Sequence, residues 1–207
     1  MNSRSLIESR LSANSIVSRL LEQREYGFLY FPICAWELES GYFNNLVWSI
    51  RDLYRDDPSG FSLENGSGIV SDPYIPLLYG LQSTRVEDSE VEAFFSTLTQ
   101  FTVVTTGTIL EENGKFNTLK LIVKSDYLEN QNAILRKNFS HIIKYSGYSP
   151  NIEIAYFKPK NGQNFVVTMM NEKDYGQIRV RSACYMKPGG EVLVYQLDDI
   201  SQAAPWF

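Results

Sequence analysis

The spacing of apolar residues along the chain predicts helices at four places. In residues 4–25, Leu6, Ala13, Val17 and Leu20 recur at helical intervals among Ser, Asn, Arg and Glu. The same spacing predicts the other three helices at residues 40–55, from about Ser89 onward, and at 127–146. For the last two, Ser89 with Glu92 and Asp126 with Glu129 have the spacing of a capping box, which marks a helix start.

Between and after these helices the apolar pattern is that of strands. Asn-Gly at 113–114 and 161–162 falls between β-rich runs, which is typical of a hairpin turn. Pro188-Gly189-Gly190 lies between a further pair of expected strands. The expected strands are 101–111 with 115–124, 152–158 with 163–170, and 177–186 with 191–197. Residues 28–34 also read as extended, and Pro32 predicts an edge or irregular strand there.

Residues 56–83 carry seven Pro and Gly residues, at 58, 60, 66, 68, 73, 76 and 80. This density predicts a long loop with short ordered pieces. Its apolar residues, such as Phe61, Ile69 and Leu78, argue against full disorder because they need a surface to pack on.

The element order predicts an α+β fold. N-terminal helices and a long loop come first, and a mostly antiparallel sheet built from hairpins, with one intervening helix packed on it, follows. We divide the chain into a helical and loop region at 1–87, interpreted as an interaction region, and a sheet domain at 88–207. The 207 residues suit one continuous compact unit.

Composition narrows the classes of partner. The net charge is −5, with no run of Lys and Arg, so we expect no nucleic-acid partner. No apolar run is long enough to span a bilayer, and no apolar segment follows the first five residues, so neither a membrane span nor a signal peptide is expected. We therefore expect a soluble, intracellular protein, free in the cytoplasm or incorporated in a particle assembled there.

The chain carries little recognisable chemistry. His141 is the single histidine, and it lies on an expected helix without a nucleophile motif around it. Cys34 and Cys184 stand alone in the sequence and read as reduced, buried thiols. Glu37 and Glu39 lie among aromatic residues, where desolvation would raise a carboxyl pKa.

No phosphate-loop or dinucleotide motif is present, and the glycines at 66 and 68 read as a plain loop. The sequence therefore predicts no catalytic residue, no metal ligand and no cofactor.

Three functions remain open. The first is a non-enzymatic subunit of a larger assembly, such as a virion or tail-type particle, with protein partners or self-association. The second is a small-molecule-binding, sensor-like module, and the third is an enzyme that depends on carboxylates or on His141. The aromatic content of 14% and the apolar N-terminal half favour the first. The residues expected at its interface are Leu20, Tyr74, Ile75, Leu77, Leu78, Tyr79, Trp206 and Phe207.

Overall fold

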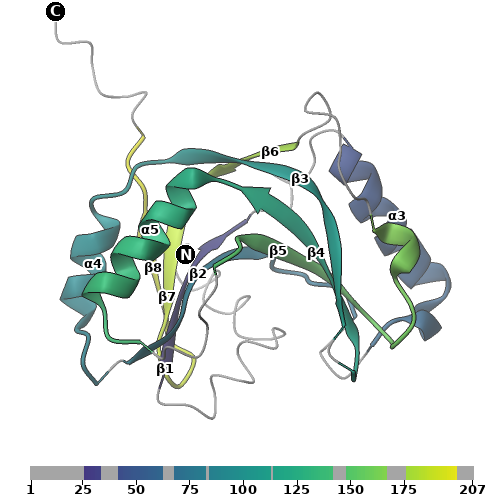
Figure 1. Cartoon of the computed structure of the whole chain (residues 1–207), viewed down its shortest axis with the longest axis horizontal. Helices are drawn as coiled ribbons and strands as arrows, with labels where there is room; N and C mark the ends of the chain where they lie inside the picture. The colour runs from purple at the N-terminus through teal and green to yellow at the C-terminus, as the bar shows by residue number, and fades with distance from the viewer. Residues whose placement is uncertain are drawn as a thin grey trace, which may run out of the picture.

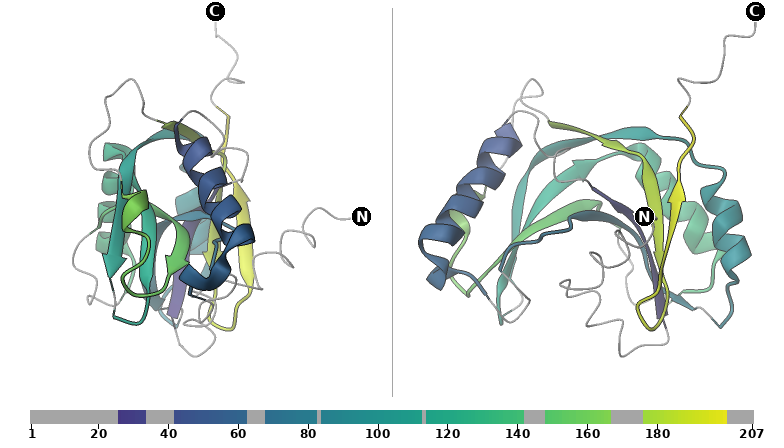
Figure 2. Two further views of the ribbon diagram at one scale, coloured as in Figure 1. Left: turned by 90° about the vertical axis from the view of Figure 1, so that its right-hand side faces the viewer. Right: turned by 180° about the vertical axis from the view of Figure 1, so that it is seen from behind.

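A computed structural model describes residues 26–33, 42–62, 68–82, 84–112, 114–141, 148–166 and 176–199. These residues form two four-stranded antiparallel sheets and three α-helices, so the predicted α+β class is confirmed. The two sheets together make an arch, and the helices lie along its outer side (Figures 1 and 2).

The first sheet, sheet A, combines strands from both ends of the chain. Its order is β2 (Tyr74–Gln82), β1 (Tyr26–Pro32), β7 (Ser182–Met186), β8 (Val192–Gln196). Strand β1 is an interior strand, because β2 and β7 pair with its two edges. Its register with β2 shifts twice, so of the two predicted alternatives the irregular strand is confirmed and the edge strand is wrong. Pro32 is tolerated because it is the last residue of β1.

The second sheet, sheet B, has the order β5 (Asn151–Phe157), β4 (Asn117–Lys124), β3 (Phe101–Glu112), β6 (Gly176–Val180). The predicted hairpin between 101–111 and 115–124 is confirmed as β3 and β4. The prediction of a single strand over residues 177–186 is wrong. The segment forms two strands that separate at Arg181, β6 in sheet B and β7 in sheet A, so the chain passes from one sheet to the other there.

The described helices are α3 (Tyr42–Asp56), α4 (Asp88–Phe95) and α5 (Asp126–Asn138). Helix α4 follows Glu87, whose backbone N–H donates to the Glu90 carboxylate (2.8 Å), so the predicted cap at Ser89 is two residues too late. The Ser125 hydroxyl caps α5 by accepting from the backbone of Leu128. Helix α5 ends at Asn138, earlier than predicted, because Phe139 is extended.

Two further predictions fail at loops. The second half of the predicted loop 56–83 is strand β2, and η2 (Pro58–Gly60) is a short 3-10 helix near its start. The strand predicted at 163–170 begins instead as the 3-10 helix η3 (Gln163–Phe165). The helix predicted at 4–25 lies outside the described residues, as do Cys34, Glu37, Glu39 and residues 63–67.

The main core fills the space between the sheets and the outer helices. Leu29, Ile75, Leu121 and Leu135 are each fully buried in it, from β1, β2, β4 and α5. A second cluster covers the opposite, concave face of sheet A, where Phe28 and Tyr30 alternate with the core residues of β1. The concave side of the arch therefore carries its own set of side chains, distinct from the main core.

Candidate active site

Two edge strands meet where sheet A and sheet B contact each other. Strand β2 is an edge of sheet A and β5 is an edge of sheet B, and the two strands contact each other. Both turn polar or aromatic side chains toward the concave side, with Tyr74 and Tyr79 on β2 and Asn151, Glu153 and Tyr156 on β5.

A β-bulge in β5 decides which side chains face the concave side. Leu119 of β4 pairs with Ala155, but its neighbour Lys120 pairs with Glu153, which leaves Ile154 as an extra residue in β5. Residues three apart on a regular strand face opposite sides of the sheet. The extra residue cancels this alternation, so Glu153 and Tyr156 lie on the same face.

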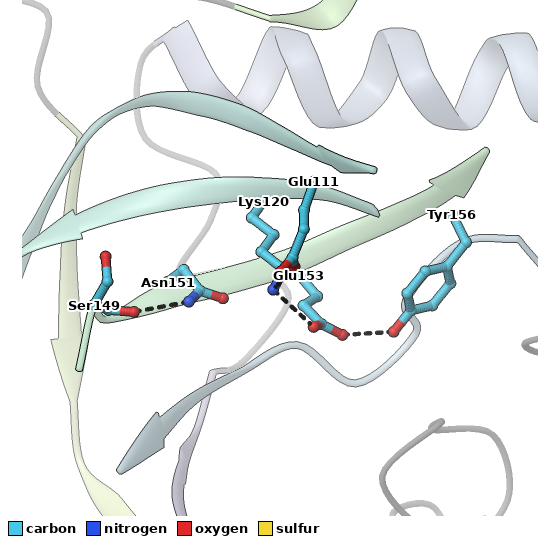
Figure 3. A network of polar contacts seen from close by, with 6 residues as sticks. All are labelled: Glu111, Lys120, Ser149, Asn151, Glu153 and Tyr156. Carbon is cyan, nitrogen blue, oxygen red and sulfur yellow. Dashed lines mark hydrogen bonds and ion pairs between the residues drawn. The ribbon is translucent and has the colours of Figure 1, made fainter. Parts of the chain in front are cut away.

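A polar network forms around Glu153 (Figure 3). The Tyr156 hydroxyl donates to Oε2 of Glu153 at 2.7 Å, and Lys120 Nζ lies 3.5 Å from Oε1. Lys120 also forms an ion pair with Glu111 of β3. The carboxylate of Glu153 is thus held from both sides, by a hydroxyl and by an ammonium group.

The three charged groups differ in their contact with solvent. The side chains of Lys120 and Glu153 are 17% and 21% exposed, whereas that of Glu111 is 60% exposed. Water screens the charge of Glu111 more strongly than that of the other two. The Lys120–Glu153 pair is therefore less accessible to water than Glu111, and the attraction between its two charges is screened less.

Asn151 lies two residues before Glu153, on the same face of β5, and it pairs with Ile122 of β4. Its side-chain nitrogen donates to the carbonyl oxygen of Ser149 at 2.8 Å. This bond fixes the amide (Figure 3) and leaves its oxygen as an acceptor beside Glu153.

Tyr74 of β2 contributes a buried hydroxyl. It is 7% exposed, and its oxygen has no hydrogen bond of normal geometry within the described part of the chain. Burial raises the pKa of Tyr74 well above its ordinary value, and the nearby Tyr79, Glu153 and Tyr156 raise it further. Tyr74 is therefore protonated at neutral pH, and its hydroxyl can donate a hydrogen bond.

The rings next to Tyr74 form an aromatic layer on the concave face of sheet A. Phe28 stacks on Tyr79 at 4.3 Å between ring centroids and on Tyr30 at 4.9 Å, and Tyr30 meets Tyr74 edge to face at 5.3 Å. These contacts hold Tyr74 in place, because aromatic pairs of this geometry are attractive beyond their buried area.

The single histidine of the chain lies away from this site. His141 pairs with Leu81 at the far end of β2, seven residues from Tyr74, a separation on the order of 20 Å. Its Nδ1 lies 2.9 Å from the carbonyl oxygen of Phe139. Cys184 is buried against Tyr30, and burial raises the pKa of its thiol to about 12. Within the described residues, no three His, Cys, Asp or Glu side chains group as metal ligands would.

The residues expected at an interface have packing roles in the described structure. Ile75, Leu77 and Leu78 lie in the main core, while Tyr74 and Tyr79 belong to the aromatic layer. Leu20, Trp206 and Phe207 lie outside the described residues. A contact between these eight residues and a partner stays a prediction.

Sequence reasoning missed Glu153, Tyr156 and Lys120. A usable signal was present, because Leu119-Lys120-Leu121 and Ile152-Glu153-Ile154 each place one charge inside an apolar strand. Such charges are rarely buried without a partner, so the two opposite charges could have been paired. The bulge that brings Tyr156 to the same face has no local signature in the sequence.

Comparisons with known proteins identify the fold. No family model matches the chain, and no curated protein matches it. Among solved structures, Usb1 of Kluyveromyces marxianus superposes with a TM-score of 0.51 at 12% identity, covering 84% of this chain and 98% of Usb1. A structure described as a phosphoesterase gives the same TM-score and identity, covering 85% of this chain and 99% of that one. At these identities the likeness establishes a shared fold.

This comparison contradicts the expected function. One solved structure that shares the fold is described as a phosphoesterase, and this contradicts the assignment to a non-enzymatic structural subunit, of a virion or another particle. The expectation of no nucleic-acid partner loses its support as well. In the described residues, no helix is long and apolar enough to cross a membrane.

Proposed function

We propose that this chain is an enzyme that cleaves a phosphoester, and that Glu153 is its general base. The observation that carries the proposal is the Lys120–Glu153–Tyr156 network at the point where the two sheets meet. The fold shared with Usb1 and with a phosphoesterase supports the class of reaction. This proposal corresponds to the third function considered from the sequence, an enzyme that depends on carboxylates. The carboxylate proposed here is Glu153, whereas the sequence had pointed to Glu37 and Glu39.

The carboxylate has the chemistry that a general base needs. Glu153 is held by the Tyr156 hydroxyl at one oxygen and by Lys120 at the other, so its orientation is fixed before a substrate arrives. It would accept the proton of an attacking hydroxyl group as that oxygen forms a bond to phosphorus. The bond from phosphorus to the leaving oxygen breaks on the opposite side, where the leaving alkoxide takes a proton from water, and Glu153 returns its proton to solvent.

Two neighbours are suited to the charge that develops during this step. Phosphoryl transfer is accelerated mainly by positioning and by stabilising charge on the phosphoryl oxygens. The Tyr74 hydroxyl is a buried, protonated donor near Tyr79 and Glu153. Lys120 is the positive charge of the network, and it is shared between the carboxylates of Glu153 and Glu111.

The substrate is proposed to be a nucleotide or an oligonucleotide. One solved structure of Kluyveromyces marxianus Usb1 that shares this fold is described as carrying uridine monophosphate, with a TM-score of 0.51 at 11% identity, covering 84% of this chain and 98% of that one. Tyr79, the partly exposed ring of the aromatic layer, lies on the same concave side as Glu153. Aromatic side chains are common partners of nucleic-acid bases.

The experiment is a hydrolysis screen in water enriched in heavy oxygen. The purified chain is incubated with bis(4-nitrophenyl) phosphate and with short RNA and DNA oligonucleotides, and products are followed by phosphorus NMR and mass spectrometry. We expect cleavage of at least one phosphodiester, with heavy oxygen on the phosphate when water is the attacking group. Binding of uridine monophosphate without cleavage of any substrate would instead show a nucleotide-binding module and would refute catalysis.

A further inference from the structure

A cavity lies between η2 and the segment that follows β5. Its volume is about 480 Å³, within the range of small-ligand sites, and neither Glu153 nor Tyr74 lines it. Figure 1 shows the segment after β5, in light green, beside α3.

The walls of this cavity are tied together by hydrogen bonds. The carbonyl oxygen of Gly60 accepts from the backbone N–H of Lys158 at 2.9 Å and from the side-chain nitrogen of Asn161 at 3.2 Å. The carbonyl oxygen of Asn161 accepts in turn from the buried side chain of Asn117 at 3.0 Å. The cavity is thus formed before any ligand binds, and this lowers the entropic cost of binding.

The backbone around the cavity is held in an uncommon conformation. Lys160 has a positive φ of 70°, and it is the only non-glycine residue in the described ranges with a positive φ. Gly162, two residues later, has φ of 94°. A Cβ at Gly162 would lie 2.6 Å from the ring of Phe157, so the chain passes directly over that ring. Conformations of this kind concentrate at ligand sites, where the surrounding structure maintains them.

The rim of the cavity is polar and carries no excess charge. Asp57 and Lys160 contribute one charge of each sign, and Asn161, Gln163 and Asn164 contribute amides. Each amide offers donors and an acceptor side by side. Such a rim suits a neutral ligand with several adjacent hydroxyl groups, because every hydroxyl both donates and accepts.

The floor is aromatic, but its rings are already packed against each other. Phe61, Phe157 and Phe165 are at most 9% exposed. Phe157 stacks on Phe165 at 5.6 Å and meets Phe61 at 4.6 Å, and Tyr54 lies edge-on to Phe61. A planar base needs a free ring face for stacking, and these contacts occupy the faces. Ring edges remain, and they leave a small apolar floor that the C–H groups of a ligand can contact.

We propose that this cavity binds a neutral saccharide, with the amides of Asn161, Gln163 and Asn164 bonding to its hydroxyl groups and the phenylalanine edges contacting its C–H groups. The site is separate from the proposed phosphoester site and does not depend on it. Binding is expected in the millimolar range, because the cavity is open and offers uncharged hydrogen bonds.

The test is an NMR titration of the full chain with glucose, galactose, mannose, N-acetylglucosamine, maltose and chitobiose, each up to ~50 mM, well above the expected range. The side-chain amide signals of Asn161, Gln163 and Asn164 are followed. We expect saturable shifts with at least one of these sugars, and the exposed double variant Gln163→Ala/Asn164→Ala is expected to bind about tenfold more weakly, since two hydrogen bonds are lost. The variant Glu153→Gln should bind the sugar as the original chain does.

Three results would overturn the proposal. The first is the absence of saturable shifts with every sugar of the panel. The second is unchanged sugar affinity in the double variant, which would place the binding elsewhere. The third is a shift of the same amide signals by uridine monophosphate, which would make the cavity part of a nucleotide site.

Discussion

Tyr156 donates a hydrogen bond of 2.7 Å to Glu153, although the two residues are only three positions apart on one strand. The extra residue Ile154 makes this contact feasible by placing both side chains on the concave face. The local irregularity of β5 therefore creates the polar network of the proposed site.

Replacing Tyr156 with Phe removes one hydrogen bond to the Glu153 carboxylate and keeps the ring. Since Tyr156 is buried and its acceptor is charged, we expect the free energy of unfolding to fall by about 1–2 kcal/mol. Urea unfolding measures this difference. Tyr127→Phe on α5 is the control and should change stability by less than ~0.5 kcal/mol. Equal losses in the two variants would mean that the Tyr156–Glu153 bond contributes nothing.

Asn132 connects α5 to the outer edge of β2. Its side-chain nitrogen donates to the carbonyl oxygen of Leu77 at 2.6 Å, and both residues are buried. Asn132→Ala leaves that carbonyl without a partner, so we expect the free energy of unfolding to fall by about 1–3 kcal/mol.

The matched control is Asn130→Ala, which changes the same residue type on the same helix at an exposed position. Alanine favours helix, so this variant should be neutral or slightly stabilised in thermal unfolding. A drop of similar size in both variants would show that Asn132 has no special role at the edge of β2.

Comparing alanine substitutions at two glycines distinguishes the cost of backbone strain from the cost of steric crowding. Gly162 and Gly114 have φ of 94° and 84°, but a Cβ would meet Phe157 at 2.6 Å in the first and nothing within 4 Å in the second. We expect Gly114→Ala to cost about 1 kcal/mol from strain alone. Gly162→Ala should cost at least ~1 kcal/mol more, since overpacking adds to the strain. Chemical denaturation compares them, and equal costs would contradict the packing of Gly162 over Phe157.

Alkaline pH should unfold the protein. Burial raises the pKa of Cys184 from 9.0 to about 12, and burial, aided by Asp88 and Glu92, raises that of Tyr195 from 10.0 to about 12. Between about pH 9 and 12 the folded chain therefore holds protons that the unfolded chain releases, and the free energy of unfolding decreases as pH rises.

Tyrosinate absorbance and circular dichroism, recorded together in a pH titration, test this. The ionisation of buried tyrosines should follow the loss of structure in one cooperative step. A gradual rise in absorbance while the circular dichroism stays native would show that these tyrosines ionise in the folded protein.

The parts of the fold that could be predicted from sequence are those with local signals. Asn-Gly at 113–114 between β-rich runs located β3 and β4, and helical spacing located α3, α4 and α5. Strand β2 was missed because Pro76 and Gly80 resemble loop residues. Both are accommodated at an edge strand with bulges, where a missing N–H and a positive φ cost little.

The site could not be predicted because it depends on pairing between distant strands. Lys120 and Glu153 become partners through the register of β4 with β5, and Tyr74 approaches them only because two sheet edges meet. The only histidine, His141, pairs instead with Leu81 at the other end of β2 from Tyr74.

The role of Glu153 as general base of phosphoester cleavage is tested by kcat/KM of the variant Glu153→Gln. The variant is measured on the substrate found in the hydrolysis screen, beside Glu129→Gln, an exposed carboxylate on α5. We expect Glu153→Gln to lower kcat/KM by about a hundredfold or more with its fold intact by circular dichroism, and Glu129→Gln to leave it within about twofold. A Glu153→Gln variant that is folded and cleaves the substrate as fast as the original chain would contradict the account.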